Sequence, residues 1–179
     1  MEGLHIRTEL ESDFDEIHEV IKAAFANQPY SQQTEHHLVQ KLRQSDAYVP
    51  DLGLVAVKNS QIVGHILLTK IQLRDGNKDA SETGLTLAPV SVRPDAQLKG
   101  IGGLLIQEAH NRARQLGYRF VLLIGHAEYY PKFGYRQAST FNIDVPFDSP
   151  PQNVMVKELY ENALQNICGS VIYPKAFFE

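Results

Sequence analysis

The first regular pattern in the chain is a stripe of apolar residues at helical spacing. Apolar side chains recur every three or four positions from residue 14 to 25, which predicts an amphipathic helix with one buried face. In front of it, Ser12-Asp13-Phe14-Asp15 resembles a capping box, in which a serine and a carboxylate satisfy the first free amides of a helix. Leu38 and Leu42 share one face of a second predicted helix over residues 34–43. The chain therefore begins with two helices that each bury one face.

Strand patterns occupy the middle of the chain. Residues 52–58 and 61–73 are rich in apolar and β-branched residues, and Asn59-Ser60 between them is typical of a tight hairpin turn. Another strand is predicted over residues 84–92, where Pro89 interrupts the pattern. Because proline donates no hydrogen bond to a strand ladder, we expect Pro89 at an edge or a bulge. The sheet is therefore expected to open near this residue.

A third helix and a buried strand follow the expected opening. The helix ends at Gly117, a residue type that commonly terminates helices. Residues 120–124 are continuously apolar, as in a strand that is buried on both faces. A strand, a helix and a buried strand in this order predict a parallel crossover. The apolar positions of the helix are Ile101, Leu105, Ala109, Ala113 and Leu116.

Length and composition limit the architecture and the class of protein. With 179 residues, of which 43% are hydrophobic, the chain is expected to form a single α/β (α+β) domain over residues 1–179. The net charge is −4, from 17 basic and 21 acidic residues, and no basic stripe is present, so a nucleic-acid partner is disfavoured. The longest apolar runs have the length of strands and are too short to cross a membrane, so no membrane partner is expected.

Cysteine and histidine usage argues against a metal site. The chain has a single cysteine, which excludes an internal disulfide and a cysteine-based metal cluster and is typical of a cytoplasmic protein. The pair His36-His37 suggests metal ligation, but adjacent residues on a helix point in different directions. No third ligand stands at a convincing spacing, so we predict no metal.

The third predicted helix begins with a concentration of glycine at Gly100, Gly102 and Gly103. The first amides of a helix have no internal partners and carry the positive end of the helix dipole, so a helix start attracts phosphate oxygens. Glycine lets the backbone approach a diphosphate closely. Both common nucleotide motifs fail, because Leu105 stands where a Rossmann fingerprint needs its third glycine and where a P-loop needs its second.

The spacing that fits is Gln97-x-x-Gly100-x-Gly102, which resembles the Q/R-x-x-G-x-G/A signature of the GNAT acyltransferases. The segment Tyr129-Tyr130-Pro131-Lys132-Phe133-Gly134-Tyr135 looks like the Y-x-K-x-G-F segment of the same superfamily. Three further segments are similar to a bacterial branch of predicted N-acetyltransferases, so the resemblance covers essentially the whole chain. These segments are Glu35-x-x-Leu38-Val39-x-x-Leu42-Arg43, Ala88-Pro89-Val90-Ser91-Val92 and Gly169-Ser170-Val171-Ile172-Tyr173-Pro174-Lys175-Ala176-Phe177.

The resemblance implies the GNAT fold, a mixed and mostly antiparallel central sheet that is splayed at a β-bulge, with helices on both faces and acetyl-CoA in the gap. Pantetheine would pair with the freed backbone of Val90 and Val92, and the amides of residues 98–103 would hold the diphosphate. Gln97 would brace this loop, and Lys99 either adds charge near the phosphates or is simply solvated. The implied coenzyme-binding residues are Val90, Val92, Gln97, Leu98, Lys99, Gly100, Ile101, Gly102, Gly103 and Tyr130.

The reaction implied by the resemblance is acetyl transfer from acetyl-CoA to an amine. A primary amine with a pKa of about 10.4 is protonated at neutral pH and must lose a proton before it attacks the thioester. Similarity to the superfamily assigns stabilisation of the oxyanion to the backbone amide of Val90, and proton donation to the leaving thiolate to Tyr130. Many members carry an asparagine where this chain has Leu123. The candidates for the general base are Glu35, His126 and Glu128, with a chain of water molecules as the alternative.

Three functions remain open from the sequence. The favoured one is direct attack by a small-molecule or peptide amine on acetyl-CoA in a ternary complex. The second is acetylation of a protein's N-terminal or lysine amine, bound in an open groove at residues 27–33 and 142–153. The third is a CoA-binding sensor or interaction module without turnover. Residues 12–44 and 142–179 are expected to shape the acceptor side, and a homodimer through the C-terminal strands is left open.

Overall fold

The computed structural model describes residues 3–29, 31–76 and 81–179. Its strands are β1 (Leu4–Thr8), β2 (Gly53–Lys58), β3 (Gln61–Arg74), β4 (Ser81–Val92), β5 (Phe120–Ile124), β6 (Arg136–Gln137), β7 (Ile143–Asp144), β8 (Val154–Glu158) and β9 (Gly169–Ile172). Its helices are α1 (Phe14–Phe25), α2 (Glu35–Arg43) and α3 (Ile101–Gln115), with several short 3-10 turns. Within these described ranges, no helix is both long enough and apolar enough to span a membrane.

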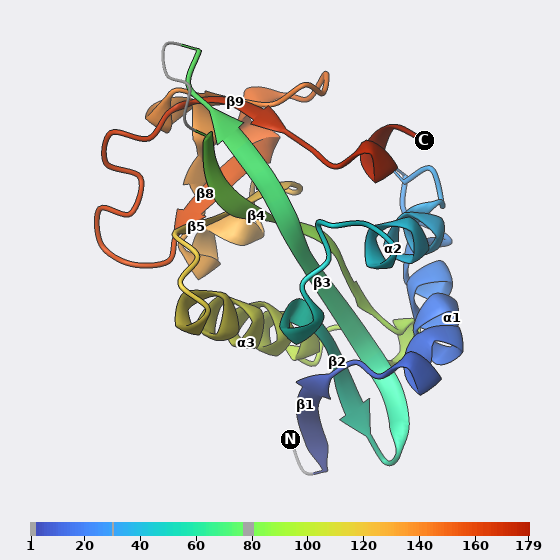
Figure 1. The fold of residues 1–179 in the computed structure, drawn as a ribbon. Helices are drawn as coiled ribbons and strands as arrows, with labels where there is room; N and C mark the ends of the chain where they lie inside the picture. The colour runs from blue at the N-terminus through green and yellow to red at the C-terminus, as the bar shows by residue number, and fades with distance from the viewer. Residues whose placement is uncertain (1–2, 30, 77–80) are drawn as a thin grey trace.

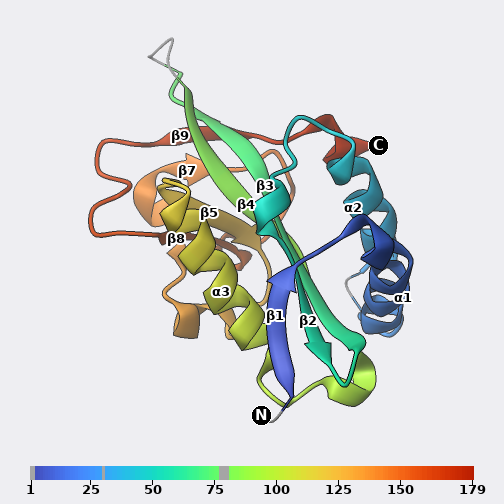
Figure 2. The same cartoon turned by 60° about the horizontal axis from the view of Figure 1, so that its bottom comes forward.

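A nine-stranded mixed sheet runs through the molecule, with α3 on one face and α1 and α2 on the other (Figure 1). The main strand order is β1-β2-β3-β4-β5-β8-β6, and the pairs along this path are antiparallel except for the parallel pair of β4 and β5. The far end of β3 also pairs with β9, which brings the C-terminal part of the chain beside the middle of the sheet (Figure 2). The predicted α/β architecture, mostly antiparallel sheet and parallel crossover are confirmed.

Alternation along β3 explains why helices cover both faces. Ile66 and Leu68 are buried in the cluster that contains the apolar face of α3. Leu67 points to the opposite face and joins the cluster of α1 and α2, as period-two alternation requires. Further along β3, Ile71 and Leu73 pack with Phe120 and with residues of β8 and β9. The sheet is therefore buried on both sides in its centre.

Pro89 lies at a β-bulge, as predicted. Ile66 of β3 pairs with Val90, whereas Leu68 pairs with Leu87, so the register between β3 and β4 shifts at this point. The strand β4 has one extra residue here, which removes the need for a ladder hydrogen bond from the proline nitrogen. The bulge lies at the start of the segment of β4 that is separated from β5, since their pairing ends at Thr86.

Three local details of the helices differ from the sequence predictions. The capping box at the N-terminal helix uses Asp13, whose carboxylate accepts a hydrogen bond from the Leu10 amide at 2.7 Å, and not Ser12. Arg7 also donates to this carboxylate, at 2.6 and 3.0 Å. In α2, Val39 is fully buried and Leu38 only partly.

Leu116, predicted on the buried stripe of α3, is 46% exposed. The reason is that α3 ends at Gln115 and Gly117 adopts a left-handed conformation with φ of 86°. The chain therefore turns before Leu116 reaches the core, and Tyr118 packs there instead.

A buried ionic cluster ties α2 to the sheet. The Glu9 carboxylate, which is completely buried, accepts hydrogen bonds from Arg43 at 2.7 and 3.0 Å, from the Tyr48 hydroxyl at 2.9 Å and from His65 Nε2 at 2.8 Å. Gly53 makes room for it, because a Cβ there would lie 2.7 Å from Glu9 Cδ. Arg43 is the last residue of α2, so this cluster anchors the end of the helix that is remote from Glu35.

Candidate active site

The parallel strands β4 and β5 separate soon after they meet. Their pairing is confined to Leu85 with Val121 and Thr86 with Leu122. Beyond Thr86, β4 continues to Val92 beside β3 alone, while β5, which pairs with β8 along its whole length, diverges from it. This separation exposes one backbone edge of β4 in the interior of the molecule.

The exposed edge carries the backbone groups of Val90 and Val92. The Arg93 amide donates to Val63 O at 2.9 Å, so it points toward β3. Because amides along a strand alternate between its two edges, those of Val90 and Val92 point away from β3 and toward the gap. The Val92 carbonyl does the same, since it accepts a hydrogen bond from Gln97 Nε2 at 3.0 Å.

The loop from Leu98 into α3 presents a run of free amides. Among the residues that the structure describes, none accepts a hydrogen bond from the amides of residues 98–103. Leu98 and Gly100 both have positive φ, of 61° and 78°, and such left-handed residues let successive amides converge on one point. For a bulky residue such as Leu98 this conformation is strained, and its side chain is fully exposed. The loop therefore has the geometry of an anion-binding nest.

The side chains of this loop have different surroundings. Gln97 braces the loop against β4 through its bond to Val92. The Lys99 ammonium donates to the Asp95 carbonyl at 2.8 Å, and Lys99 and Ile101 line a separate hollow beside Val63. A contribution of Lys99 and Ile101 to coenzyme binding would therefore come from their amides.

A cavity of about 380 Å³ lies in the gap between β4 and β5, and we call it the splay cavity. It brings together six of the predicted residues from four parts of the chain. Glu128, by contrast, is exposed and does not line the cavity, and Leu123 is buried in the core on the side of α3. The six residues are Glu35, Val90, Val92, Gln97, His126 and Tyr130.

Tyr130 is held in the splay cavity by aromatic neighbours. Its ring contacts Tyr129 and Tyr135 edge to face, at centroid distances of 5.1 and 5.7 Å. Burial raises the pKa of Tyr130 above its ordinary value, and Tyr129 adds to this rise. Its hydroxyl makes no hydrogen bond with another described residue. Tyr130 therefore keeps its proton at neutral pH and presents an uncommitted donor.

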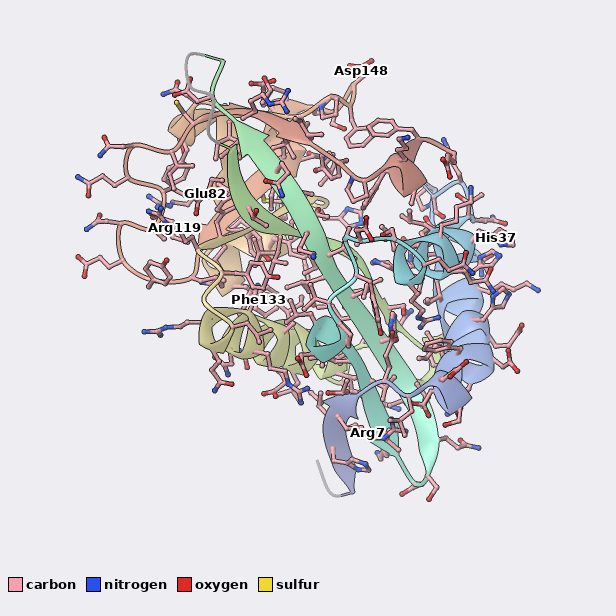
Figure 3. All side chains as sticks on the ribbon, in the orientation of Figure 1. Arg7, His37, Glu82, Arg119, Phe133 and Asp148 are labelled. Carbon is pink, nitrogen blue, oxygen red and sulfur yellow. The ribbon has the colours of Figure 1, made fainter. Side chains whose placement is uncertain are left out.

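The aromatic cluster also rests on the start of α3. The ring of Phe133, labelled in Figure 3, lies so close to α3 that a Cβ on Gly103 would come within 3.4 Å of it. A Cβ on Gly102 would likewise lie 3.4 Å from the Tyr129 hydroxyl. The absence of side chains at these two glycines brings the loop of free amides and the tyrosines together.

Gly125 is a residue of the site that the sequence patterns did not indicate. A Cβ at this position would lie 2.5 Å from Tyr130 Cε2, which is closer than real Cβ contacts allow.

Replacing Gly125 with alanine is therefore expected to displace the Tyr130 ring and lower kcat by roughly tenfold or more, at a stability cost of about 1–3 kcal/mol for overpacking. The measurement is steady-state kinetics with a thermal melt. A matched control is Gly76→Ala, whose added Cβ would meet no atom within 4 Å, and it should have the kcat and stability of the parent. An unchanged kcat in Gly125→Ala would refute the prediction.

Glu35 enters the splay cavity from the start of α2. Its Oε1 accepts a hydrogen bond from Ser31 Oγ at 2.5 Å, while its Oε2 is enclosed and has no partner among the described residues. His126 lines the same cavity from the loop after β5 and is exposed. Of the three predicted candidates for the base, the structure thus brings Glu35 and His126 into the cavity. Phe25 and Gln28 also line it, and both come from the segment 12–44 that was expected to shape the acceptor side.

The histidines of the two N-terminal helices cluster at the surface. His18 of α1 lies 4.5 Å from His36 between ring centroids, and His36 lies 4.0 Å from His37. His37 points outward from α2 (Figure 3). In the described part of the chain, no group of three or more histidine, cysteine, aspartate or glutamate residues is arranged to hold a metal ion.

Comparison with known proteins agrees with this geometry. The model of the Acetyltransferase (GNAT) domain family matches residues 5–138. The uncharacterized N-acetyltransferase YjhQ of Escherichia coli K12 is 33% identical over 143 residues, which cover 79% of this chain and 75% of that protein. The uncharacterized N-acetyltransferase YhbS of the same strain is 25% identical over 173 residues, covering 96% and 97%.

Solved structures show the same fold. A GNAT family acetyltransferase from Brucella melitensis, crystallised with acetyl-CoA, is 32% identical with a TM-score of 0.78, and the match covers 97% of each chain. The crystal structure of Escherichia coli YhbS with CoA has a TM-score of 0.87 at 21% identity, covering 98% of this chain and 92% of that one. The splayed sheet, the free amides before α3 and these matches together show that the chain belongs to the GNAT acetyltransferase family.

Proposed function

We propose that the protein transfers an acetyl group from acetyl-CoA to an amine by direct attack in a ternary complex. The observation that carries this proposal is that a free strand edge and Tyr130 line one cavity, and that a run of free amides begins directly after Gln97 in its wall. The Brucella melitensis relative, which was crystallised with acetyl-CoA, supports the choice of cosubstrate.

The residues around the gap fit coenzyme A. Six successive amides, those of residues 98–103, have no acceptor within the described chain and suit the oxygens of a diphosphate. The backbone of Val90 and Val92 suits the amide groups of pantetheine, because it forms an unpaired strand edge. When bound, acetyl-CoA supplies an activated acetyl thioester. We assign Gln97 to bracing the loop and the amides of residues 98–103 to binding the diphosphate.

Groups of the chain itself are available to stabilise the developing charge and to carry out each proton transfer of the reaction. In the overall reaction a C–N bond forms and the C–S bond breaks; the protonated amine loses two protons, of which one protonates the thiolate and one is released to solvent. We assign Val90 N–H to the charge that develops on the carbonyl oxygen and Tyr130 to the protonation of the thiolate. We assign removal of the amine proton to Glu35 or His126, which both line the splay cavity, acting directly or through water.

The first test is binding of acetyl-CoA, measured by calorimetry with a Gly100→Val/Gly102→Val variant. Valine at position 100 is strained at φ of 78°, and valine at position 102 crowds the Tyr129 hydroxyl. We expect the affinity of the variant to fall by roughly tenfold or more, because the amides can no longer converge on the diphosphate.

Gly76→Ala serves as the control, since its Cβ meets nothing within 4 Å, and it should bind like the parent. If the parent protein bound neither acetyl-CoA nor CoA, the proposed function would be wrong. If it bound CoA but acetylated no amine, the sensor function would be favoured.

A further inference from the structure

A second hollow, of about 310 Å³, opens beside the splay cavity on the face of the sheet covered by the C-terminal segment. Leu87, Ala88 and Ile124 line both hollows, so the two adjoin at the point where β4 and β5 separate. We call the second hollow the aromatic chamber. Its other walls are Thr86, Phe147, Ser149, Tyr173 and Phe177.

The walls of the aromatic chamber are aromatic rings that hold one another in place. Tyr173 packs edge to face on Phe147 at a centroid distance of 4.8 Å and on Phe177 at 5.0 Å. Phe177 also packs against the cluster of α1 and α2, which fixes it from a second side. These contacts make the chamber a preformed apolar site and not a chance opening between mobile side chains.

The aromatic chamber has a polar floor without partners. Tyr173 is only 7% exposed, and its hydroxyl lies beside Thr86 but makes no hydrogen bond of normal geometry with any described residue. Buried polar groups are normally hydrogen-bonded, so the Tyr173 hydroxyl indicates a polar group of a ligand at this end of the chamber.

The opposite end of the combined space is suited to a cation. Glu35 lines the splay cavity, and its enclosed Oε2 has no partner among the residues described. A protonated amine would pair with this carboxylate before it loses its proton. A molecule that spans both hollows thus needs an amine at one end, an apolar body, and a hydrogen-bonding group at the other end.

Resting on the proposed function, we propose that the acceptor is a small primary amine joined by a short alkyl linker to an apolar ring that carries a hydroxyl. The ring lies in the aromatic chamber against Phe147 and Phe177, the ring hydroxyl reaches Tyr173, and the amine lies in the splay cavity near Glu35. The volume is sufficient, because a cavity of about 150 Å³ already binds benzene. Apolar contact supplies most of the affinity and the hydroxyls supply the selectivity.

The experiment compares kcat/KM for tyramine, phenethylamine, ethanolamine and the dipeptide glycylglycine. Tyramine should exceed ethanolamine and glycylglycine by roughly tenfold or more, and exceed phenethylamine by a smaller factor. Tyr173→Phe should remove the preference for tyramine over phenethylamine, mainly through KM. Tyr160→Phe is the matched control, because Tyr160 is exposed and lies outside both hollows, and it should leave the preference intact.

A second variant fills the chamber without touching the proposed chemistry. Ser149→Phe should lower kcat/KM for tyramine by roughly tenfold or more while that for ethanolamine stays the same, because only the ring-bearing amine uses this space. Titration of tyramine into the complex with CoA gives a readout that needs no turnover, and Ser149→Phe should weaken this binding too.

The outcomes separate this inference from the proposed function. Acetylation of ethanolamine or glycylglycine as fast as tyramine would overturn the aromatic acceptor and leave the acetyltransferase in place. Failure of tyramine to bind the CoA complex would overturn it as well, whatever the turnover. Failure of the parent protein to bind acetyl-CoA would instead refute the proposed function.

Discussion

Replacing Tyr130 with phenylalanine is expected to lower kcat by about a hundredfold or more and to leave the affinity for CoA nearly unchanged. General acid catalysis is commonly worth about 10²–10⁴ in rate, and the variant removes only the hydroxyl that donates the proton. The ring contacts with Tyr129 and Tyr135 remain, so the aromatic cluster should stay in place. Single-turnover kinetics under saturating acetyl-CoA, with calorimetry for CoA, measure both quantities.

The control for this prediction is Tyr118→Phe, which removes a hydroxyl outside the splay cavity. Its kcat should equal that of the parent. A Tyr130→Phe enzyme with full kcat would show that another group or water protonates the thiolate. A loss of CoA affinity as large as the loss of kcat would assign Tyr130 to coenzyme binding alone.

Replacing Glu9 with alanine should produce the largest loss of stability, about 3–5 kcal/mol of unfolding free energy, because removal of one partner leaves Arg43 as an unpaired charge in the interior. His65 and Tyr48 lose their acceptor at the same time. Denaturant unfolding measures the effect. Glu11→Ala, an exposed neighbour, should change stability by less than about 0.5 kcal/mol. A Glu9→Ala loss below about 1 kcal/mol would mean that the cluster contributes little net stability.

The same cluster predicts the direction of the pH dependence. Burial raises the pKa of Glu9, but hydrogen bonds from His65 and Arg43 outweigh it and hold the value at about 2, against 4.5 for an ordinary glutamate. The stability from Glu9 is therefore complete above about pH 4.5 and is lost as the pH falls toward 2. Burial lowers the pKa of His65 below 6.5, so protonation of the unfolded chain adds to the loss below that pH. Glu9→Gln should flatten the stability profile between pH 4.5 and 2.

The side of the site proposed to bind the coenzyme is largely predictable from the sequence. The motif from Gln97 to Gly103 lies within seven residues, and free amides at a helix start follow from local geometry alone. Pro89 likewise marks the bulge, because a missing N–H is a property of the residue itself. Periodicity correctly indicated α1, α2 and α3, because amphipathic spacing is repeated over several turns.

The acceptor side could not be read in this way. Phe147, Tyr173 and Phe177 come from a segment with short strands and many turns, and no periodic pattern shows that their rings meet beside Thr86. Gly125 gave no signal either, because its role depends on the ring that packs above it. Leu116 was assigned to the core because periodicity does not report where a helix ends against the sheet.

The sequence by itself determined the elements whose interactions span a few residues: the helices, the hairpin at Asn59-Ser60, the bulge at Pro89 and the glycine loop before α3. Only the tertiary structure decided which distant groups share an environment. Glu9 meets Arg43 and His65 across 34 and 56 positions, and Glu35 shares a cavity with Tyr130. The physical reason is that hydrogen bonds and periodicity within an element act locally, whereas burial, pKa and the shape of a cavity depend on all the elements that pack around a side chain.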